Sequence, residues 1–251
     1  MIKWKDKEIE TLREAPDLSV LELSTRLDRS PKSVARMRER LGLCKPKTKG
    51  EVNHAFFSVW SAEMAYVLGY WFADGCIFYD RANNSYYFDL SSKDLAHLVK
   101  IRSLFSSNHK LNPQVDNMFR LRFASKGIFD DIVRLGGHPS KSFTALFPVM
   151  SSFFKQFFIR GYLDGDGHIS VKTNGYPELG FTGTENMLLG ISKALPGPYN
   201  RLYKEKNIFR LRYYGDNAVI AMDLIYKENP AIFMERKHRR YLRSLEWKQE
   251  R

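Results

Sequence analysis

The sequence contains the same nine-residue pattern twice, as VLGYWFADG at residues 67–75 and IRGYLDGDG at residues 159–167. In both copies a glycine precedes an apolar block and an Asp-Gly pair follows it, and the closing glycines are 92 residues apart. Each apolar block predicts a helix, and the C-terminal end of a helix carries partial negative charge from its unpaired carbonyl groups. An aspartate there, Asp74 or Asp166, is unfavourable unless a cation lies nearby. The duplication therefore predicts that the two acids meet at one metal site.

The composition is typical of a globular protein with a polyanionic partner. Hydrophobic residues make up 43% of the 251 residues, which is enough for a substantial core. Forty Lys and Arg against 28 Asp and Glu give a net charge of +12, so nucleic acid is the first candidate partner. Two cysteines, Cys44 and Cys76, cannot build a disulfide framework, and the charged residues 1–10 lack a secretory pattern. We therefore expect an intracellular, reducing compartment and no membrane partner.

Residues 4–43 have the apolar spacing of three short helices. Ser30 and Pro31 form a favourable N-cap and first-turn pair for the third helix. This unit resembles a helix-turn-helix DNA-binding domain with residues 31–41 as its recognition helix, and a small structural cap is the alternative. Residues 44–55 contain proline, glycine and several lysines, which predicts a basic linker. The basic residues that we expect to contact DNA from the third helix are Lys32, Arg36, Arg38 and Arg40.

The repeat extends well beyond the nine-residue motif. Residues 88–105 resemble residues 179–195, and MFRLRF at 118–123 resembles IFRLRY at 208–213. The pattern therefore predicts, in each half, a motif helix, two strands, a helix, two strands and a final helix. The final helix falls near residues 126–135 in the first half and near residues 215–226 in the second. We expect an α+β protein with two αββαββα halves, residues 56–145 and 146–251, related by a pseudo-twofold axis.

Small residues on the motif helices indicate that the two helices pack closely. Each helix has two small residues four positions apart, which lie on one helical face. Packing along these faces would bring Asp74 and Asp166 together, and close carboxylates repel unless one is protonated or a divalent metal neutralises them. Carboxylate oxygens suit Mg²⁺, which can promote phosphodiester hydrolysis. The small residues are Gly69 and Ala73 in the first copy, and Gly161 and Gly165 in the second.

Arginines alternate with apolar residues in the two matching strands at 118–123 and 208–213. One face of each strand should pack on helices, and the other should present the arginines. A solvated strand face is the alternative, but matching arginines in both halves of a basic protein favour a DNA-facing sheet. Arginine can read guanine or hold a phosphate, and the sequence leaves both roles open. The predicted DNA contacts are Arg120, Arg122, Arg210, Arg212 and Lys172, with Asn174, Arg201 and Tyr203 as extensions.

Over residues 56–245 these features resemble the LAGLIDADG homing endonucleases that carry two motifs in one chain. The resemblance implies a monomer with two antiparallel, saddle-shaped sheets that binds a long double-stranded DNA site and cuts both strands with Mg²⁺ or Mn²⁺, leaving 3′ overhangs. It places the metal-binding acids at Asp74 and Asp166, with backbone carbonyls from Ala73 and Gly165. It also implies one basic residue of each half near the scissile phosphates, and by position these are Lys141 and Lys237. Phe72 departs from the usual acidic sixth motif residue, which the second copy keeps as Asp164.

Two binding functions on the same fold are alternatives to cleavage. One is a transcription regulator, and the other is an RNA maturase with intron RNA as its partner. An acid in both motifs disfavours the regulator, because a fold kept only for binding has no need for paired carboxylates that face an anion. Maturase activity is compatible with DNA cleavage.

Overall fold

The computed structural model of the chain describes residues 4–15, 18, 20–43, 50–199, 201–227 and 231–249. It divides into two compact units, Met1–Lys49 and Gly50–Arg251. Cys44 and positions 44–49 of the predicted linker lie outside the described residues. In the described part of the chain, none of the helices is both long enough and apolar enough to span a bilayer.

The N-terminal unit is a bundle of three short helices, as the sequence predicted: α1 (Asp6–Glu14), α2 (Val20–Leu27) and α3 (Pro31–Arg40). Each helix contributes one fully buried apolar side chain, and these are Leu12, Leu23 and Val34. The Oγ of Ser30 accepts a hydrogen bond from the backbone N–H of Ser33 and so caps α3. Helices of this length are marginal in isolation, so their stability depends on this shared core.

The second unit contains the two predicted halves, and both have the order αββαββα. The first half consists of α4 (Ala62–Asp74), β1 (Gly75–Asp80), β2 (Ser85–Ser92), α5 (Leu95–Leu104), β3 (Leu111–Pro113), β4 (Phe119–Ala124) and α6 (Lys126–Arg134). The second consists of α7 (Ser152–Asp166), β5 (Gly167–Val171), β6 (Pro177–Gly183), α8 (Glu185–Ala194), β7 (Arg201–Glu205), β8 (Ile208–Tyr214) and α9 (Gly215–Tyr226). A further helix, α10 (Glu235–Gln249), follows the second half and was not part of the predicted order.

Each half builds one antiparallel sheet of four strands. The strand orders are β1-β2-β4-β3 and β5-β6-β8-β7, so the two sheets have the same topology. In β4 the apolar residues Leu121 and Phe123 are buried, while Arg120 and Arg122, which alternate with them, lie on the other face. This alternation is the one that the sequence predicted, and it places the arginines on the sheet face opposite the buried apolar residues.

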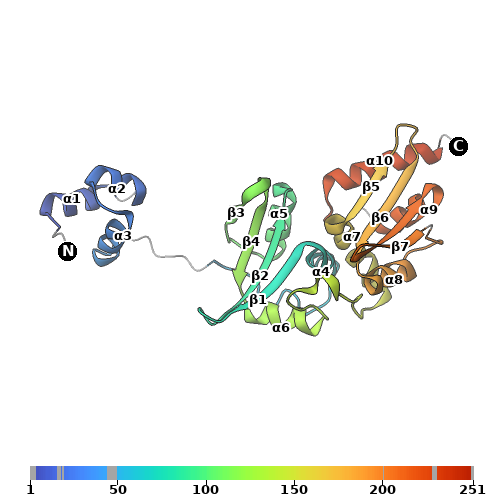
Figure 1. Cartoon of the computed structure of the whole chain (residues 1–251), viewed down its shortest axis with the longest axis horizontal. Helices are drawn as coiled ribbons and strands as arrows, with labels where there is room; N and C mark the ends of the chain where they lie inside the picture. The colour runs from blue at the N-terminus through green and yellow to red at the C-terminus, as the bar shows by residue number, and fades with distance from the viewer. Residues whose placement is uncertain are drawn as a thin grey trace. The chain divides into compact units, whose positions relative to one another are not determined.

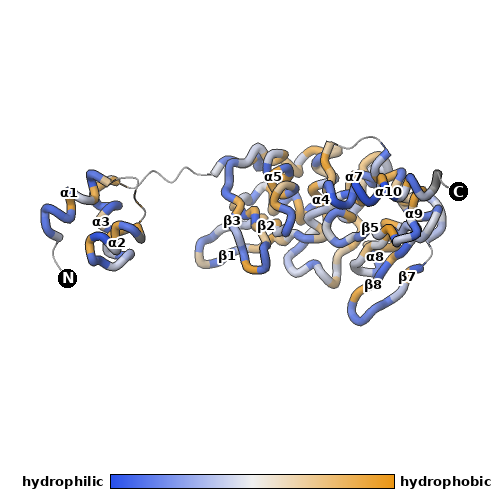
Figure 2. Tube along the Cα trace, turned by 90° about the horizontal axis from the view of Figure 1, so that it is seen from above, coloured by the Kyte–Doolittle hydropathy of each residue, from blue (hydrophilic) through white to orange (hydrophobic). Residues whose placement is uncertain are grey.

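The motif helices α4 and α7 pack against each other between the two sheets, as Figures 1 and 2 show. A Cβ atom on Gly69 would overlap the carbonyl oxygen of Phe158, and one on Gly161 would overlap the carbonyl oxygen of Tyr66. The contact is reciprocal, because Tyr66 and Phe158 are equivalent motif-helix positions. Helix α4 is hydrophobic along most of its length, as its colour in Figure 2 indicates, and it is buried from Met64 to Phe72. The predicted close packing of the two helices along their glycine faces is therefore present.

Candidate functional site

The two motif aspartates are the last residues of the paired helices, Asp74 on α4 and Asp166 on α7. The small faces bring these helix ends together, because a Cβ atom on Gly165 would lie on Ala73 and 3.4 Å from Oδ2 of Asp74. Both aspartates are exposed to solvent, whereas most of each helix is buried. The arrangement therefore presents two carboxylates at an accessible position between the two halves.

The protein around the two aspartates disfavours their charged forms. The pKa of Asp74 is raised to about 6, chiefly by burial and then by the negative charge of Asp166, while Lys237 and Lys141 oppose the rise. The pKa of Asp166 is also raised by burial, and the same two lysines oppose the shift. Solvent reaches both carboxylates, yet neighbouring protein atoms displace part of their hydration. A divalent cation bound between them would relieve this repulsion.

Lys141 lies in the short helix η2 (Lys141–Phe143) and is buried next to the first aspartate. Its Nζ donates a hydrogen bond of 2.6 Å to the carbonyl of Gly75, directly after α4, and lies 4.7 Å from the ring centroid of Trp71. Burial lowers the pKa of this ammonium to about 8, and Asp166, Cys76 and Asp74 oppose the shift. Lys141 therefore places a positive charge close to both motif acids.

Lys237 lies on α10 and is buried against the end of α7. Its Nζ donates hydrogen bonds to the carbonyls of Leu163, Asp164 and Gly165, the last two at 2.8 and 3.3 Å. Burial lowers the pKa of Lys237 to about 8, chiefly against the opposing charge of Asp164. The sequence predicted a cation at the C-terminal end of α7, and the ammonium group of Lys237 supplies part of that positive charge. The carbonyl of Gly165, which was expected to face a metal, accepts a hydrogen bond from Lys237.

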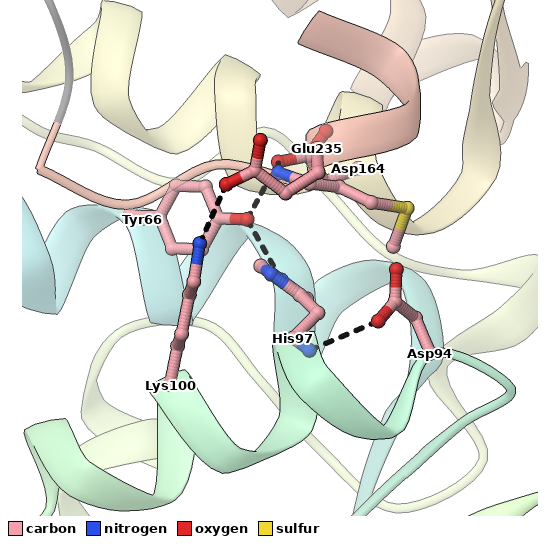
Figure 3. A network of polar contacts seen from close by, with 7 residues as sticks. Tyr66, Asp94, His97, Lys100, Asp164 and Glu235 are labelled. Atoms are coloured by element: carbon pink, nitrogen blue, oxygen red, sulfur yellow. Dashed lines mark hydrogen bonds and ion pairs between the residues drawn. The ribbon is translucent and has the colours of Figure 1, made fainter.

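A buried polar network joins the two halves beside this site (Figure 3). The Tyr66 hydroxyl donates a 2.6 Å hydrogen bond to Oδ2 of Asp164, and Nε2 of His97 lies 2.9 Å from the same hydroxyl. The backbone N–H of Met234 donates to the same Asp164 oxygen at 2.8 Å. Burial raises the pKa of Asp164, while it lowers the pKa of His97 to about 4. Sequence reasoning missed this network, because its members are 31 to 98 positions apart in the chain.

A cavity of about 510 Å³ lies beside Asp74 and is lined by residues of both halves. Its lining includes Tyr70, Lys93, Gly165 and Arg236. Lys93 and Arg236 are exposed, and together with the acids Asp94 and Asp164 they line the cavity beside the first aspartate. Neither of these two basic residues belongs to the duplicated motif or to the alternating strands, which is why the sequence analysis passed over them.

The predicted strand arginines lie on the sheet faces, and each is near an acidic side chain that the sequence analysis did not include. Arg122 donates from Nε to Asp89 at 2.6 Å, and Nε of Arg120 lies 3.6 Å from the same carboxylate. In the second sheet Arg210 contacts Glu205 at 2.6 Å, and Arg212 contacts Glu178 at 3.0 Å. Lys172 is exposed in the turn between β5 and β6, with Nζ 5.3 Å from the ring centroid of Tyr176.

In the N-terminal unit, three of the four predicted basic residues are exposed on one side of α3. Lys32, Arg36 and Arg40 line an open cavity of about 590 Å³ together with Trp4 and Arg29. Arg38 does not share that surface, so its predicted role in DNA contact is corrected. Its side chain is buried and donates a 2.8 Å hydrogen bond to the carbonyl of Leu18, which holds α3 against the preceding segment.

Comparison with models of protein families found no match. Comparison with curated proteins likewise found none. The structure is, in contrast, similar to solved structures of LAGLIDADG homing endonucleases. It matches the meganuclease I-AabMI bound to uncleaved DNA with a TM-score of 0.53 and 11% identity over 74% of this chain and 90% of that one.

Two further matches are of the same kind. The LAGLIDADG homing endonuclease I-LtrWI bound to target DNA matches with a TM-score of 0.52 and 11% identity, over 79% of this chain and 91% of that one. The homing endonuclease I-WcaI bound to its DNA recognition sequence matches with a TM-score of 0.51 and 13% identity, over 81% and 96%. The protein therefore has the LAGLIDADG homing endonuclease fold with both halves in one chain, and at these identities the likeness is one of fold.

Proposed function

We propose that this protein is a site-specific, metal-dependent endonuclease that cuts both strands of duplex DNA and leaves 3′ overhangs. The observation that carries the proposal is the pair of exposed aspartates, Asp74 and Asp166, at the junction of two equivalent sheets with arginine-bearing faces. A buried lysine lies beside each aspartate. The DNA-bound state of the structurally similar endonucleases supports the same conclusion.

The donor groups of the site fit Mg²⁺ or Mn²⁺ in the presence of a phosphate. Among the described residues no three His, Cys, Asp or Glu side chains lie close enough to hold a metal together. The protein ligands proposed for the metal are therefore the two carboxylates of Asp74 and Asp166. Mg²⁺ is commonly held by one or two carboxylates together with water and substrate phosphate oxygens. Bound by Asp74 and Asp166, such an ion would supply charge neutralisation at the phosphate and lower the pKa of a bound water.

The two lysines are assigned different parts in this reaction. Lys141 lies within the electrostatic reach of both aspartates, and its lowered pKa of about 8 is close to neutral pH. We assign it to the charge that develops on the phosphate oxygens or to proton transfer there. Lys237 donates to three carbonyls at the end of α7, so it positions Asp166. The two sheets would hold the duplex, with a monomer covering both half-sites.

The N-terminal unit is assigned to a second DNA contact through Lys32, Arg36 and Arg40. Its tether to the nuclease would raise the effective concentration of this contact and lengthen the recognised site. Replacing all three residues by alanine should weaken binding of the full chain to its target and lower the salt dependence of that binding. A triple variant with unchanged affinity and salt dependence would assign this unit to a structural role.

The direct test begins by selecting cleaved sites from a randomised duplex library in the presence of Mg²⁺. With a selected site, Asp166→Asn should abolish nicking while binding is retained, because the amide keeps the shape and removes the charge that holds the metal. Asp130→Asn is the matched control, since Asp130 is an exposed acid on α6 paired with Lys126, and it should cut normally. Cleavage by Asp166→Asn at the normal rate refutes the assignment.

The same experiment distinguishes the two alternatives without cleavage. A wild-type protein that binds one duplex site tightly but never cuts it, with either Mg²⁺ or Mn²⁺, would be a regulator of this fold. Affinities for duplex DNA and for folded intron RNA, measured at one salt concentration, test the maturase alternative, because electrostatic binding to both polymers depends steeply on salt.

A further inference from the structure

We infer that Arg122 and Arg212 each read a guanine, one in each half of the DNA target, whereas Arg120 and Arg210 contact phosphates. The inference rests on the proposed function, since it concerns the DNA-facing side of the two sheets. It answers the question that the sequence leaves open, namely which of the four strand arginines is directed at bases. The evidence is the way in which each guanidinium is held.

Arg122 is held both at one edge and across its plane. Its Nε and Nη2 contact Asp89 at 2.6 and 2.5 Å, and the Asp89 side chain is only 9% exposed. The guanidinium carbon lies 4.9 Å from the ring centroid of Phe78 and 6.0 Å from that of Tyr87, and these two rings stack on each other. The side chain of Arg122 remains 37% exposed. The guanidinium is therefore oriented before DNA arrives, with part of it still accessible.

Arg212 in the second sheet is held through one nitrogen, where Arg122 uses two. Its Nη1 lies 3.0 Å from Glu178, whose side chain is 13% exposed, and donates to the Tyr214 hydroxyl at 3.3 Å. Its guanidinium carbon lies 5.7 Å from the ring centroid of Tyr203. Here too, a shielded carboxylate and aromatic side chains surround the guanidinium. The Arg212 side chain keeps 25% of its surface exposed.

The two halves hold these guanidinium groups with residues at different positions. Arg122 on β4 is directly paired with Asp89 on β2, so the acid is opposite the arginine. At the equivalent point of the second sheet, Arg212 is paired with Gly180, and the acid is two residues earlier on β6. A side chain at Gly180 would overlap the ring of His168, so the histidine occupies the space that an acid would need at this position. What the halves share is the held guanidinium itself.

Arg120 and Arg210 lack this arrangement. Nε of Arg120 is 3.6 Å from Asp89, and Arg210 pairs with Glu205, which is 46% exposed. No aromatic ring within the described part of the chain lies over either guanidinium. The first contact is long, and the second has an exposed acid as its partner, so both are weaker than the contacts of Arg122, and these side chains can turn toward a phosphate. They would then supply positioning contacts that carry no base information.

The held arginines suit base recognition for two physical reasons. A carboxylate beside a guanidinium offsets part of its charge, which reduces the attraction of phosphates to it. A planar fork that is already oriented loses less conformational freedom when it forms two hydrogen bonds, and guanine offers the matching pair of acceptors, O6 and N7. Because β4 and β8 are equivalent about the pseudo-twofold axis, the two guanines should lie at equal distances from the centre of the target, on opposite strands.

The test compares binding profiles of full-length proteins in an Asp166→Asn background, so that cleavage does not interfere. Each protein is used to select bound sequences from a randomised duplex library. Arg122→Lys and Arg212→Lys keep the charge but remove the fork, and each should lower the preference for guanine at one of two mirror positions by about 10-fold or more. Arg120→Lys and Arg210→Lys are comparison variants from the same strands, and they should alter the affinity for all sequences alike without changing the preference for any base, since phosphate contacts carry no base information.

A second measurement uses the Asp166→Asn protein without further changes and replaces guanine by 7-deazaguanine at each position of the selected site. Loss of the N7 acceptor should weaken binding by about 10-fold at the two mirror positions and have little effect elsewhere. Unchanged profiles for both lysine variants, together with tolerance of 7-deazaguanine at the mirror positions, overturn the inference while the proposed nuclease stands. Failure to bind any duplex refutes the proposed function instead.

Discussion

The partial burial of Asp74 and the neighbouring charge of Asp166 predict that this proposed metal ligand opposes folding when no metal is bound. Its pKa is raised from 3.8 to about 6, so the folded state holds the proton more tightly than the unfolded chain does. The stabilisation from this proton is present below pH 3.8 and is lost as the pH rises to about 6. The rise in the pKa of Asp74 corresponds to about 3 kcal/mol for a fully buried group. Because solvent reaches and screens this carboxylate, the effect on the free energy of unfolding should be on the order of 1 kcal/mol.

Asp74→Asn should therefore stabilise the metal-free protein while it removes metal binding. In EDTA at pH 7.5, the variant should unfold about 2–4 °C above the wild type, since the second unit has the size for which 1 kcal/mol has this effect. Addition of Mg²⁺ should raise the melting temperature of the wild type and leave that of the variant unchanged. At pH 5 the response of the wild type should shrink, because the Asp74 carboxyl is then mostly protonated.

Asp164→Asn is the control that separates this argument from a general effect of removing acids. Asp164 is buried on α7, and its Oδ2 accepts hydrogen bonds from Tyr66 and Met234. The weaker amide acceptor should destabilise the protein in EDTA and in Mg²⁺ alike. The assay is thermal unfolding followed by circular dichroism. The reasoning is refuted if Asp74→Asn lowers the melting temperature in EDTA, or if it keeps the full response to Mg²⁺.

Three further predictions concern the packing that supports the site. In urea unfolding, Tyr66→Phe should lower the unfolding free energy by about 2 kcal/mol, because the buried Asp164 carboxylate loses a donor. Tyr70→Phe should lower it by about 1 kcal/mol, because only a neutral hydrogen bond to Ser92 is lost. Equal losses would contradict the assigned pairing. Lys237→Met should lower the unfolding free energy by about 2 kcal/mol, because three carbonyls lose their donor. A variant that is as stable as the wild type but cleaves more slowly would instead place Lys237 in the reaction. Gly161→Ala should cost about 3 kcal/mol by overlap with the Tyr66 carbonyl, and a melting temperature equal to that of the wild type would argue against the close helix contact.

The sequence predicted the order of elements in both halves because their signals are local and occur twice. The spacing of apolar residues in the motifs at 67–75 and 159–167 depends only on neighbours within one helix, and the matching strands supported each other. The close approach of α4 and α7 was likewise readable, since glycine faces at Gly69 and Gly161 leave space that only another backbone can fill. Helix α10 lies outside the repeat, so no second copy pointed to it.

Partners across the sheets were beyond the reach of the sequence, because they depend on strand register. Asp89 faces Arg122 only because β2 and β4 pair at that point, and Glu178 reaches Arg212 from a position that is not equivalent. The burial of Arg38 was missed for a related reason. On a short helix that is basic on several sides, the side that packs is decided by the other helices, and here it is the carbonyl of Leu18 that takes the guanidinium.

The helix interface also shows why the two halves are no longer interchangeable. Tyr66 and Phe158 occupy equivalent positions on α4 and α7, as do Phe72 and Asp164. One side of the interface therefore pairs Tyr66 with Asp164 through a hydrogen bond, while the other side packs the ring of Phe72 against that of Phe158.

Pairing of two identical halves would lose both arrangements. Two first halves would bury two Tyr66 hydroxyls against Phe72, and two second halves would bury two Asp164 carboxylates against Phe158. Tyr66 would keep His97 and Asp164 would keep the Met234 N–H as partners within their own halves, but each would lose the hydrogen bond across the interface, at a cost of about 1–3 kcal/mol. The presence of one polar pair, Tyr66 and Asp164, and one apolar pair, Phe72 and Phe158, thus favours the pairing of unlike halves. As a result, Asp74 and Asp166 have different neighbours in the site.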